Sequence, residues 1–170
     1  QIICSDKTGT LTQNKMTVVD FFGEEEKYLA RAMALCCDAE LAEDGTVSGE
    51  PTEAALVVWA NKTGLPKYEL KKLYPRSGEA PFDSSRKMMS TVHTADGKYI
   101  QYTKGAPDVV IGKCTHYIED GKAVPMTEEY KASILSANKA MADKALRVLA
   151  CAMKEWENAP ESYEAEHLEN

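Results

Sequence analysis

Two Asp-Gly dipeptides, each lying between short segments of alternating polarity, place the strongest constraint on the fold. Asp96-Gly97 separates residues 87–93 from 98–103, and Asp120-Gly121 separates residues 115–118 from 122–124. Asp-Gly suits the tight two-residue turn that joins antiparallel strands, because both turn residues need positive φ. The sequence therefore predicts two β-hairpins.

Helices are predicted between and around these hairpins. Residues 24–37 begin with acidic residues, which favour a helix N-terminus, and carry a periodic apolar face. A second helix is predicted from Pro51 to Gly64, and a third over residues 128–144 with Thr127 as its cap. The charged run 67–74 leaves helix and loop open. Antiparallel hairpins with helices at intervals predict an α+β fold, an antiparallel β-sheet flanked by helices.

The remaining segments give weaker signals. Residues 17–22 are rich in β-branched and aromatic side chains and residues 147–153 alternate, so both are predicted as strands. Residues 38–49 are polar with a turn at Asp44-Gly45. The acidic tail 157–170 is expected to bury little.

Composition limits the class of protein. The chain has 170 residues, 44% apolar and 28% charged, which suits one globular domain with a sizeable core. Its net charge of −7 gives no electrostatic support for nucleic-acid binding. No apolar run approaches the ~20 residues that a membrane helix needs. The cysteines are odd in number and form no C-x-x-C pair, so we expect reduced, mostly buried thiols: Cys4, Cys36, Cys37, Cys114 and Cys151.

The segment 2–16 carries the strongest chemical signal. Asp6 follows a short apolar segment, and a carboxylate at the end of a buried strand can attack a phosphoryl group to form an aspartyl phosphate. Lys7 can offset phosphate charge, and Thr8 offers oxygens for Mg²⁺ and phosphate. The alternative is a surface aspartate in an ordinary strand-turn.

Thr8 also bears on the fate of such an intermediate. A phosphatase would need a second acid two residues after Asp6 to protonate the leaving group and activate water, and threonine cannot do so at neutral pH. A soluble aspartyl-based phosphatase is therefore disfavoured, and an acyl phosphate here is expected to last long enough to drive another process.

The run Asp6-Lys7-Thr8-Gly9-Thr10-Leu11-Thr12 resembles the phosphorylation signature of the P-type ATPases, ion pumps with an aspartyl-phosphate intermediate. The resemblance implies catalytic roles for Asp6, Lys7 and Thr8, with Asp6 and Thr8 also holding Mg²⁺. Four later segments resemble the nucleotide-binding (N) domain of this family, in the family's order: 49–56, 81–87, 104–108 and 147–150.

The first two segments imply the adenine contacts. In the family, the residue matching Glu53 accepts a hydrogen bond from the adenine amino group, and a carboxylate prefers that donor to the carbonyl of guanine. Phe82 is expected to stack on adenine, with Lys87 beside the base or the phosphates. The alternatives are a helix-dipole role for Glu53 and a core position for Phe82.

The last two segments complete the expected site. Lys104 matches the family's lysine at the mouth of the adenosine cleft, and Gly105 leaves room for a ligand near the backbone. Arg147 is expected to contact nucleotide phosphates and Leu149 to line the adenine pocket. The alternatives are a solvated lysine at a strand end and a surface arginine on a strand.

The resemblance also implies the organisation of a larger protein. Residues 1–16 match the start of a discontinuous phosphorylation domain, 17–156 the nucleotide-binding domain, and 157–170 an acidic return segment toward the phosphorylation domain. We expect a fragment of a type II cation pump similar to calcium-transporting ATPases, forming a cytoplasmic domain of an integral protein of the cell membrane. Its partners would be ATP with Mg²⁺ and the parent's phosphorylation, actuator and transmembrane domains.

Two expectations follow for the isolated chain, which should be monomeric. It should bind ATP with negligible turnover, since phosphoryl transfer depends on groups that the rest of the phosphorylation domain supplies. The rival class is a regulatory ATP-binding module without catalysis, and the Asp6 loop disfavours it because such a module has no use for that loop.

Overall fold

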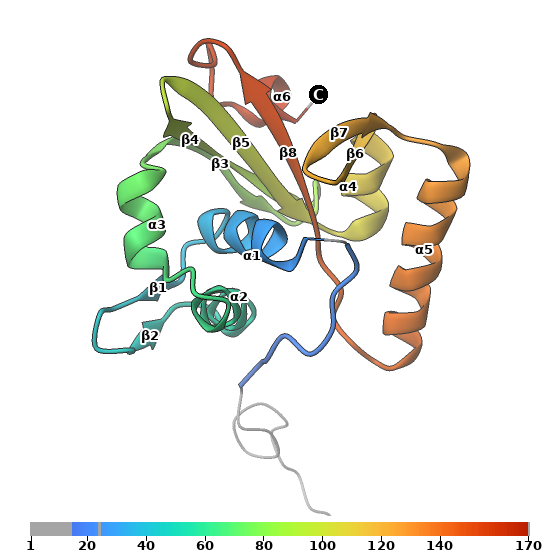
Figure 1. The fold of residues 1–170 in the computed structure, drawn as a ribbon, viewed down its shortest axis with the longest axis horizontal. Helices are drawn as coiled ribbons and strands as arrows, with labels where there is room; N and C mark the ends of the chain where they lie inside the picture. The colour runs from blue at the N-terminus through green and yellow to red at the C-terminus, as the bar shows by residue number, and fades with distance from the viewer. Residues whose placement is uncertain (1–14, 24, 170) are drawn as a thin grey trace, which may run out of the picture.

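A four-stranded antiparallel sheet forms the centre of the computed structural model, which describes residues 15–23 and 25–169. The predicted Asp6 loop therefore lies outside the described residues. The strand order is β3-β4-β5-β8 (Figure 1), with β3 Arg76–Asp83, β4 Met88–Ala95, β5 Lys98–Gly105 and β8 Ala150–Trp156. The α+β class predicted from the sequence is confirmed.

Both predicted hairpins are confirmed. Asp96 and Gly97 join β4 to β5 with φ of 50° and 78°, and Asp120 and Gly121 join β6 (His116–Glu119) to β7 (Lys122–Pro125) with φ of 48° and 72°. Positive φ at both positions gives the type I′ twist that matches the flanking strands.

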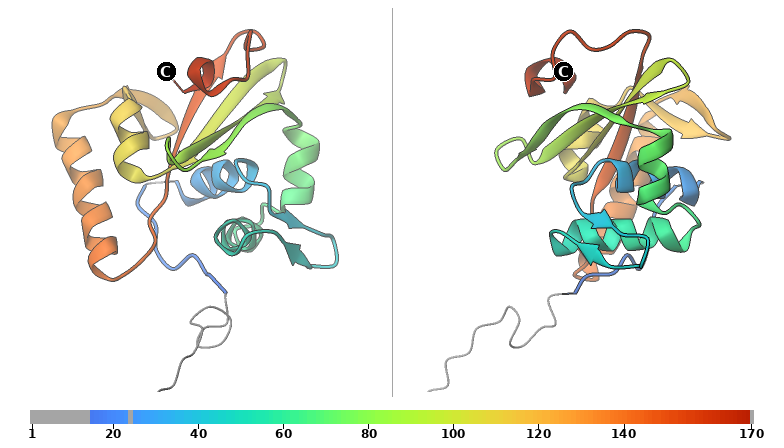
Figure 2. Two further views of the ribbon diagram at one scale, coloured as in Figure 1. Left: turned by 180° about the vertical axis from the view of Figure 1, so that it is seen from behind. Right: turned by 90° about the vertical axis from the view of Figure 1, so that its left-hand side faces the viewer.

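Three helices lie on one side of the sheet. They are α1 (Glu26–Leu35), α2 (Pro51–Lys62) and α3 (Lys67–Leu73), and α1 lies between the sheet and α2 (Figures 1 and 2). Leu35 packs with Met89 and Tyr102 in the main core, and each of these side chains is at most 1% exposed. A short hairpin of β1 (Glu40–Leu41) and β2 (Val47–Ser48) contacts α2.

The opposite side of the sheet is covered by later elements. The short helix α6 (Ala165–Leu168) lies there, and Leu168 packs against Ala80 and Val92 (Figure 2). Helix α4 (Pro107–Lys113) contacts β5 and β8. Since both faces are covered, β4 has six consecutive buried residues, 88–93, instead of the alternation typical of an antiparallel strand.

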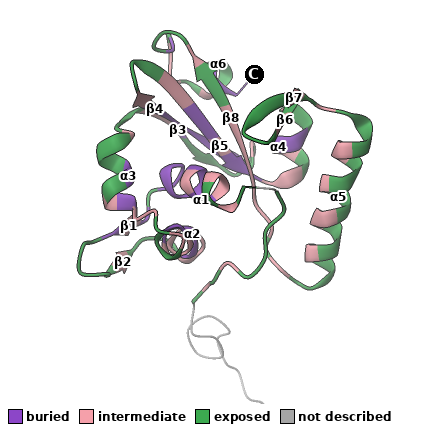
Figure 3. Cartoon of the chain, viewed as in Figure 1, coloured by how far each residue is buried: buried purple, intermediate pink, exposed green. Residues whose placement is uncertain are grey.

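Helix α5 (Glu128–Asp143) is the least buried of the long elements. It has no fully buried residue, whereas buried positions concentrate on α1 and the central strands (Figure 3). The Tyr130 ring stacks on Tyr117 of β6 with the ring centroids 3.6 Å apart. The predicted cap is confirmed, because the Thr127 hydroxyl accepts a hydrogen bond from the Tyr130 N–H at 3.1 Å.

Three predictions were wrong. Residues 17–22 form no strand, and the Phe21 ring lies instead 6.0 Å from the ring of Trp59. Strand β8 begins at Ala150, three residues after the predicted start, and Arg147 precedes it. The acidic tail does bury side chains, as Leu168 is 2% exposed.

The described cysteines are free thiols: Cys36, Cys37, Cys114 and Cys151. Burial raises the pKa of Cys36 to about 11, and its Sγ lies within hydrogen-bonding distance of the Met89 and Tyr102 carbonyls. Burial also raises the pKa of Cys37, Cys114 and Cys151, so the described thiols stay protonated at neutral pH. Within the described residues, 15–23 and 25–169, no helix has both the length and the apolar character required to traverse a membrane.

Candidate nucleotide-binding site

Strand register brings the predicted nucleotide residues to one end of the central sheet. Asp83 of β3 is paired with Met88 of β4, Met88 with Gly105 of β5, and Gly105 with Ala150 of β8. These four positions form a row across the sheet. They include or directly adjoin the predicted Phe82, Lys87, Lys104, Gly105 and Leu149.

Glu53 and Lys104 form an ion pair beside this row. The Lys104 Nζ lies 2.5 Å from the Glu53 Oε1, and the side chains are only 7% and 17% exposed. The alternative of a solvated lysine at a strand end is therefore wrong. Each charge compensates the other at this largely buried position, and separating them would leave two unpaired charges. The ion pair therefore holds both side chains in place.

The second oxygen of Glu53 binds the loop that follows α1. The Glu53 Oε2 accepts hydrogen bonds from the N–H groups of Asp38 at 2.8 Å and Ala39 at 3.1 Å. The first turn of α2 supplies the position, since Glu50 caps that helix by accepting from the Thr52 and Glu53 N–H groups. Glu53 thus has specific partners beyond the helix dipole.

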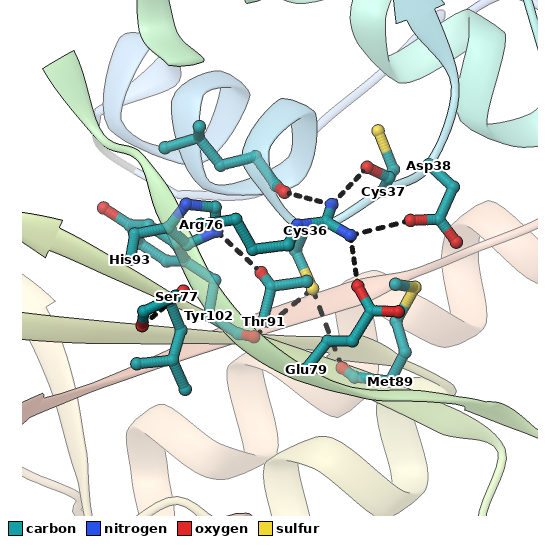
Figure 4. A network of polar contacts seen from close by, with 12 residues as sticks. Cys36, Cys37, Asp38, Arg76, Ser77, Glu79, Met89, Thr91, His93 and Tyr102 are labelled. Atoms are coloured by element: carbon teal, nitrogen blue, oxygen red, sulfur yellow. Dashed lines mark hydrogen bonds and ion pairs between the residues drawn. The ribbon is translucent and has the colours of Figure 1, made fainter. Parts of the chain in front are cut away.

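Arg76 holds the same loop from the other side (Figure 4). Its Nη2 donates to the carbonyls of Leu35 at 3.2 Å and Cys37 at 2.6 Å, and its Nη1 binds Asp38 at 2.8 Å and also Glu79. The Leu35 carbonyl at the end of α1, which has no partner within the helix, is satisfied in this way, as is the Cys37 carbonyl in the loop.

Lys67 completes the support for the loop. Only 2% exposed, it donates to the carbonyls of Cys37 at 2.7 Å and Ala39 at 2.5 Å. Two cations thus bind the loop's carbonyls while Glu53 binds its N–H groups. The position of the Glu53 carboxylate is therefore set by a network of directed bonds.

Phe82 lies on a local irregularity of β3. The β3–β4 register shifts between Ala80 and Asp83, as at a β-bulge, and the Phe82 side chain is 62% exposed. A core position for Phe82 is therefore wrong. Bulges redirect side chains at sheet edges, and here the result is an accessible aromatic ring.

The turn after Phe82 is held by the Asp83 side chain and by Ala106, the residue that follows β5. The Asp83 Oδ1 accepts from the Ser85 hydroxyl and from the N–H groups of Ser85 and Arg86, and these bonds lower the pKa of Asp83. Lys87 has φ of 56°, and its carbonyl accepts the Ala106 N–H at 2.9 Å. Its side chain is exposed, as a phosphate contact would require.

Gly105 is needed for this close approach. A Cβ at position 105 would lie 2.4 Å from the Lys87 carbonyl oxygen and 2.5 Å from the Met88 Cβ. The space beside Gly105 is thus taken by the chain itself, so the glycine positions the Lys87 turn rather than leaving room for a ligand.

Arg147 extends toward the first turn of α2. Its Nη1 donates to the Thr52 Oγ1 at 2.7 Å, next to Glu53 in the sequence. The residue is exposed, and Leu149, just before β8, is partly buried. The structure therefore places Arg147 at the first turn of α2, although no strand carries it.

Comparison with known proteins identifies the family of this domain. Residues 25–170 match the family model described as "P-type ATPase, cytoplasmic domain N". The chain belongs to this family. The predicted family and its N-domain fold are thereby confirmed.

Two relatives that match most of this chain are named as calcium-transporting ATPases. "Calcium-transporting ATPase 1" of Lactococcus lactis subsp. lactis (strain IL1403) is 45% identical over 90% of this chain and 19% of the relative. "Calcium-transporting ATPase 1" of Bacillus cereus (strain ATCC 10987 / NRS 248) is 43% identical over 99% of this chain and 20% of the relative. The chain thus spans about a fifth of the length of these relatives.

Several residues that shape the N-domain site gave no signal in the sequence. Lys67 lies in a charged run that is typical of a solvated surface, yet it is buried because its carbonyl partners come from residues 28 and 30 positions earlier. Arg76 and Arg86 also bind distant or backbone acceptors. The identity of a residue and of its neighbours in the sequence carries no information about such hydrogen-bond acceptors.

A cavity of about 600 Å³ lies apart from this cluster. It is bounded by one stripe of α2, including Val58, Trp59 and Lys62, and by residues 15–18, and Glu53, Phe82 and Lys104 do not line it. The candidate site thus lies outside this cavity, at the end of the sheet where Phe82 is 62% exposed.

Proposed function

We propose that this chain binds ATP at the end of the sheet where Phe82, Glu53 and Lys104 lie. The observation that carries the proposal is an exposed Phe82 ring at the same end of the sheet as the doubly anchored Glu53–Lys104 ion pair. An exposed aromatic face provides a stacking surface for a base, worth ~1–3 kcal/mol. Leu149 would contact the same base from the start of β8.

Base preference would come from Glu53. A carboxylate can only accept hydrogen bonds, and its two oxygens offer about four acceptor sites. Three donors occupy the carboxylate here, namely Lys104 and the N–H groups of Asp38 and Ala39. The remaining acceptor site could accept a hydrogen bond from the amino group of adenine, whereas it would repel the carbonyl oxygen of guanine.

The phosphates would be bound by cations at the rim of the site. Lys87 is exposed on the turn after Phe82, and Arg147 presents a planar guanidinium next to Thr52. Arginine suits phosphate because its donors form a rigid fork. When ATP binds, its phosphates would thus replace the Thr52 hydroxyl as the hydrogen-bond acceptor of Arg147.

In the longer parent protein, we propose that the bound ATP delivers its γ-phosphate to Asp6. Lys7 and Thr8 would assist, and Asp6 and Thr8 would hold Mg²⁺, which neutralises phosphate charge. Residues 17–156 would form the nucleotide domain, and 157–170 would lead toward the phosphorylation domain. The parent would be a cation-transporting membrane enzyme, and the names of the relatives favour calcium.

Calorimetric titration of the 170-residue chain tests nucleotide binding. We expect ATP and ADP to bind with a free energy on the order of −4 to −6 kcal/mol, and GTP to bind more weakly. Equal affinity for GTP would remove the role assigned to Glu53.

Phe82→Ala tests the stacking surface. We expect most adenine affinity to be lost, while the melting temperature stays close to that of the wild type because the ring is 62% exposed. Phe22→Ala is a matched control, since Phe22 is 42% exposed and contacts Tyr130 away from the site. Unchanged ATP affinity in Phe82→Ala would refute the site.

The phosphorylation step is tested separately. Incubation with γ-labelled ATP followed by an acid quench should leave label on Asp6 in the full-length parent and none in its Asp6→Asn variant. The 170-residue chain should stay unlabelled. Stoichiometric label on that chain would show that the rest of the phosphorylation domain is dispensable.

A further inference from the structure

The outer face of the sheet, opposite α1, carries buried polar side chains that bind the C-terminal segment, residues 157–169. Gln101 and Ser90 are at most 3% exposed on this face. The Gln101 Nε2 donates to the Leu168 carbonyl at 2.8 Å, and the Ser90 Oγ donates to the Glu169 Oε1 at 3.0 Å. Docking of the segment is therefore specified by side-chain hydrogen bonds as well as by the burial of Leu168.

Glu169 is the most strongly bound residue of the segment. It is 7% exposed, its second carboxylate oxygen forms an ion pair with Arg86, and its carbonyl accepts from the Lys113 Nζ at 2.6 Å. Elements from three parts of the chain thus converge on one residue. A buried carboxylate needs such partners, because burying an uncompensated charge is costly.

Arg86 connects Glu169 to the nucleotide site. Its Nη2 donates to the Pro81 carbonyl at 2.6 Å, and Pro81 directly precedes Phe82. The β3–β4 register is irregular between Ala80 and Asp83, so regular strand pairing does not hold this stretch. The Arg86 bond supplies a constraint at the point where the ladder is interrupted.

We propose that Glu169 is a positioning residue for the nucleotide site. Its carboxylate orients Arg86, Arg86 holds the Pro81 carbonyl, and the turn carrying Phe82 and Lys87 is thereby fixed. Docking of the C-terminal segment and binding of the nucleotide are coupled through this chain of contacts. The inference deepens the proposed ATP site and rests on it for its functional meaning.

Reciprocity follows from the coupling. If docking of the C-terminal segment strengthens ATP binding, then ATP must strengthen docking of the segment by the same factor. Docking of the C-terminal segment therefore becomes stronger when ATP occupies the site at Phe82, even though Glu169 itself touches no part of the proposed ligand site.

A double-mutant cycle in the 170-residue chain tests the route through Arg86. We expect Glu169→Ala to weaken ATP binding by roughly 3- to 10-fold, Glu169→Gln to retain part of the affinity, and Glu161→Gln, at an exposed position of the same segment, to change nothing. In an Arg86→Ala background, Glu169→Ala should cause no further loss. Additive losses would overturn the proposal.

Hydrogen exchange gives a readout that needs no ligand. The N–H groups of Ser85, Arg86 and Lys87 are hydrogen-bonded within the turn, and we expect them to exchange faster in Glu169→Ala and Glu169→Gln than in wild type. Unchanged exchange over residues 82–87 in folded variants would overturn the positioning role. If wild type fails to bind ATP, the proposed function falls, and the exchange result still decides this inference.

Discussion

Acid should destabilise this domain through His93. The imidazole is 2% exposed, with Nδ1 2.9 Å from the Tyr74 carbonyl and Nε2 2.9 Å from the Thr91 hydroxyl. Burial, with the nearby cations Arg76 and Lys67, lowers the pKa of His93 to about 4 from its usual 6.5. The neutral ring is therefore the form that the folded state prefers.

The sign and size of the effect follow from linkage. Between pH 6.5 and 4 the unfolded chain takes up a proton at His93 and the folded chain does not, so stability falls as pH falls and levels off below pH 4. At pH 5 the loss amounts to about 2 kcal/mol. For a small domain this is a large share of the total stability.

Urea unfolding at pH 7 and pH 5, followed by tryptophan fluorescence, measures the loss. The glutamine in His93→Gln can still donate to Tyr74 and accept from Thr91, but it does not titrate. Between pH 7 and pH 5 the variant should therefore lose about 2 kcal/mol less stability than wild type loses. His116→Gln, at an exposed position, should follow wild type. The reasoning would be refuted if wild type and His93→Gln lost equal stability over this interval.

Two further substitutions test the packing that supports the site. Leu168→Ala should cost about 2–5 kcal/mol because Leu168 is 2% exposed, whereas Leu135→Ala, 42% exposed on α5, should change unfolding by less than about 0.5 kcal/mol; equal urea midpoints would show that the C-terminal segment is not docked. Gly105→Ala should cost about 1–3 kcal/mol because its Cβ meets the Lys87 carbonyl, while Gly112→Ala, with no atom within 4 Å of its Cβ, is the control; a fully stable Gly105→Ala in the same assay would contradict the close approach.

The sequence predicted the hairpins well because their signals are local. The residues of the Asp96-Gly97 and Asp120-Gly121 turns adopt the positive φ angles that a hairpin needs. The strands on either side of each turn then pair with each other. Helix α2 was predicted for the same reason, since Pro51 and Gly64 mark its ends. No distant partner is needed for these assignments.

Long-range partners account for the errors. Residues 17–22 have strand-forming side chains, but β propensity depends on a neighbouring strand and a buried face. Phe21 and Phe22 instead lie beside the rings of Trp59 and Tyr130. The acidic tail was expected to bury little because it is mostly polar, yet Leu168 and Glu169 find specific partners on the sheet.

The site was predictable in its parts but not in its connections. The resemblance singled out Glu53 and Lys104 individually, and only the structure shows that they form an ion pair. Phe82 could not be assigned to surface or core from its identity alone, because its exposure results from the register shift in β3. Gly105 was expected to leave room for a ligand, but in the structure the Lys87 carbonyl and Met88 take the space beside it.

The burial of β4 on both faces has a consequence for mutational tolerance. In an antiparallel strand with one solvated face, about half of the positions accept polar or charged substitutions. Residues 88–93 are buried without interruption, with α1 on one side and the C-terminal segment on the other. Saturation mutagenesis of the domain should therefore find six neighbouring intolerant positions here, where a surface-facing strand would give every second one. Substitutions at Ser90 and at Met89, adjacent in sequence, would damage opposite faces of the same sheet.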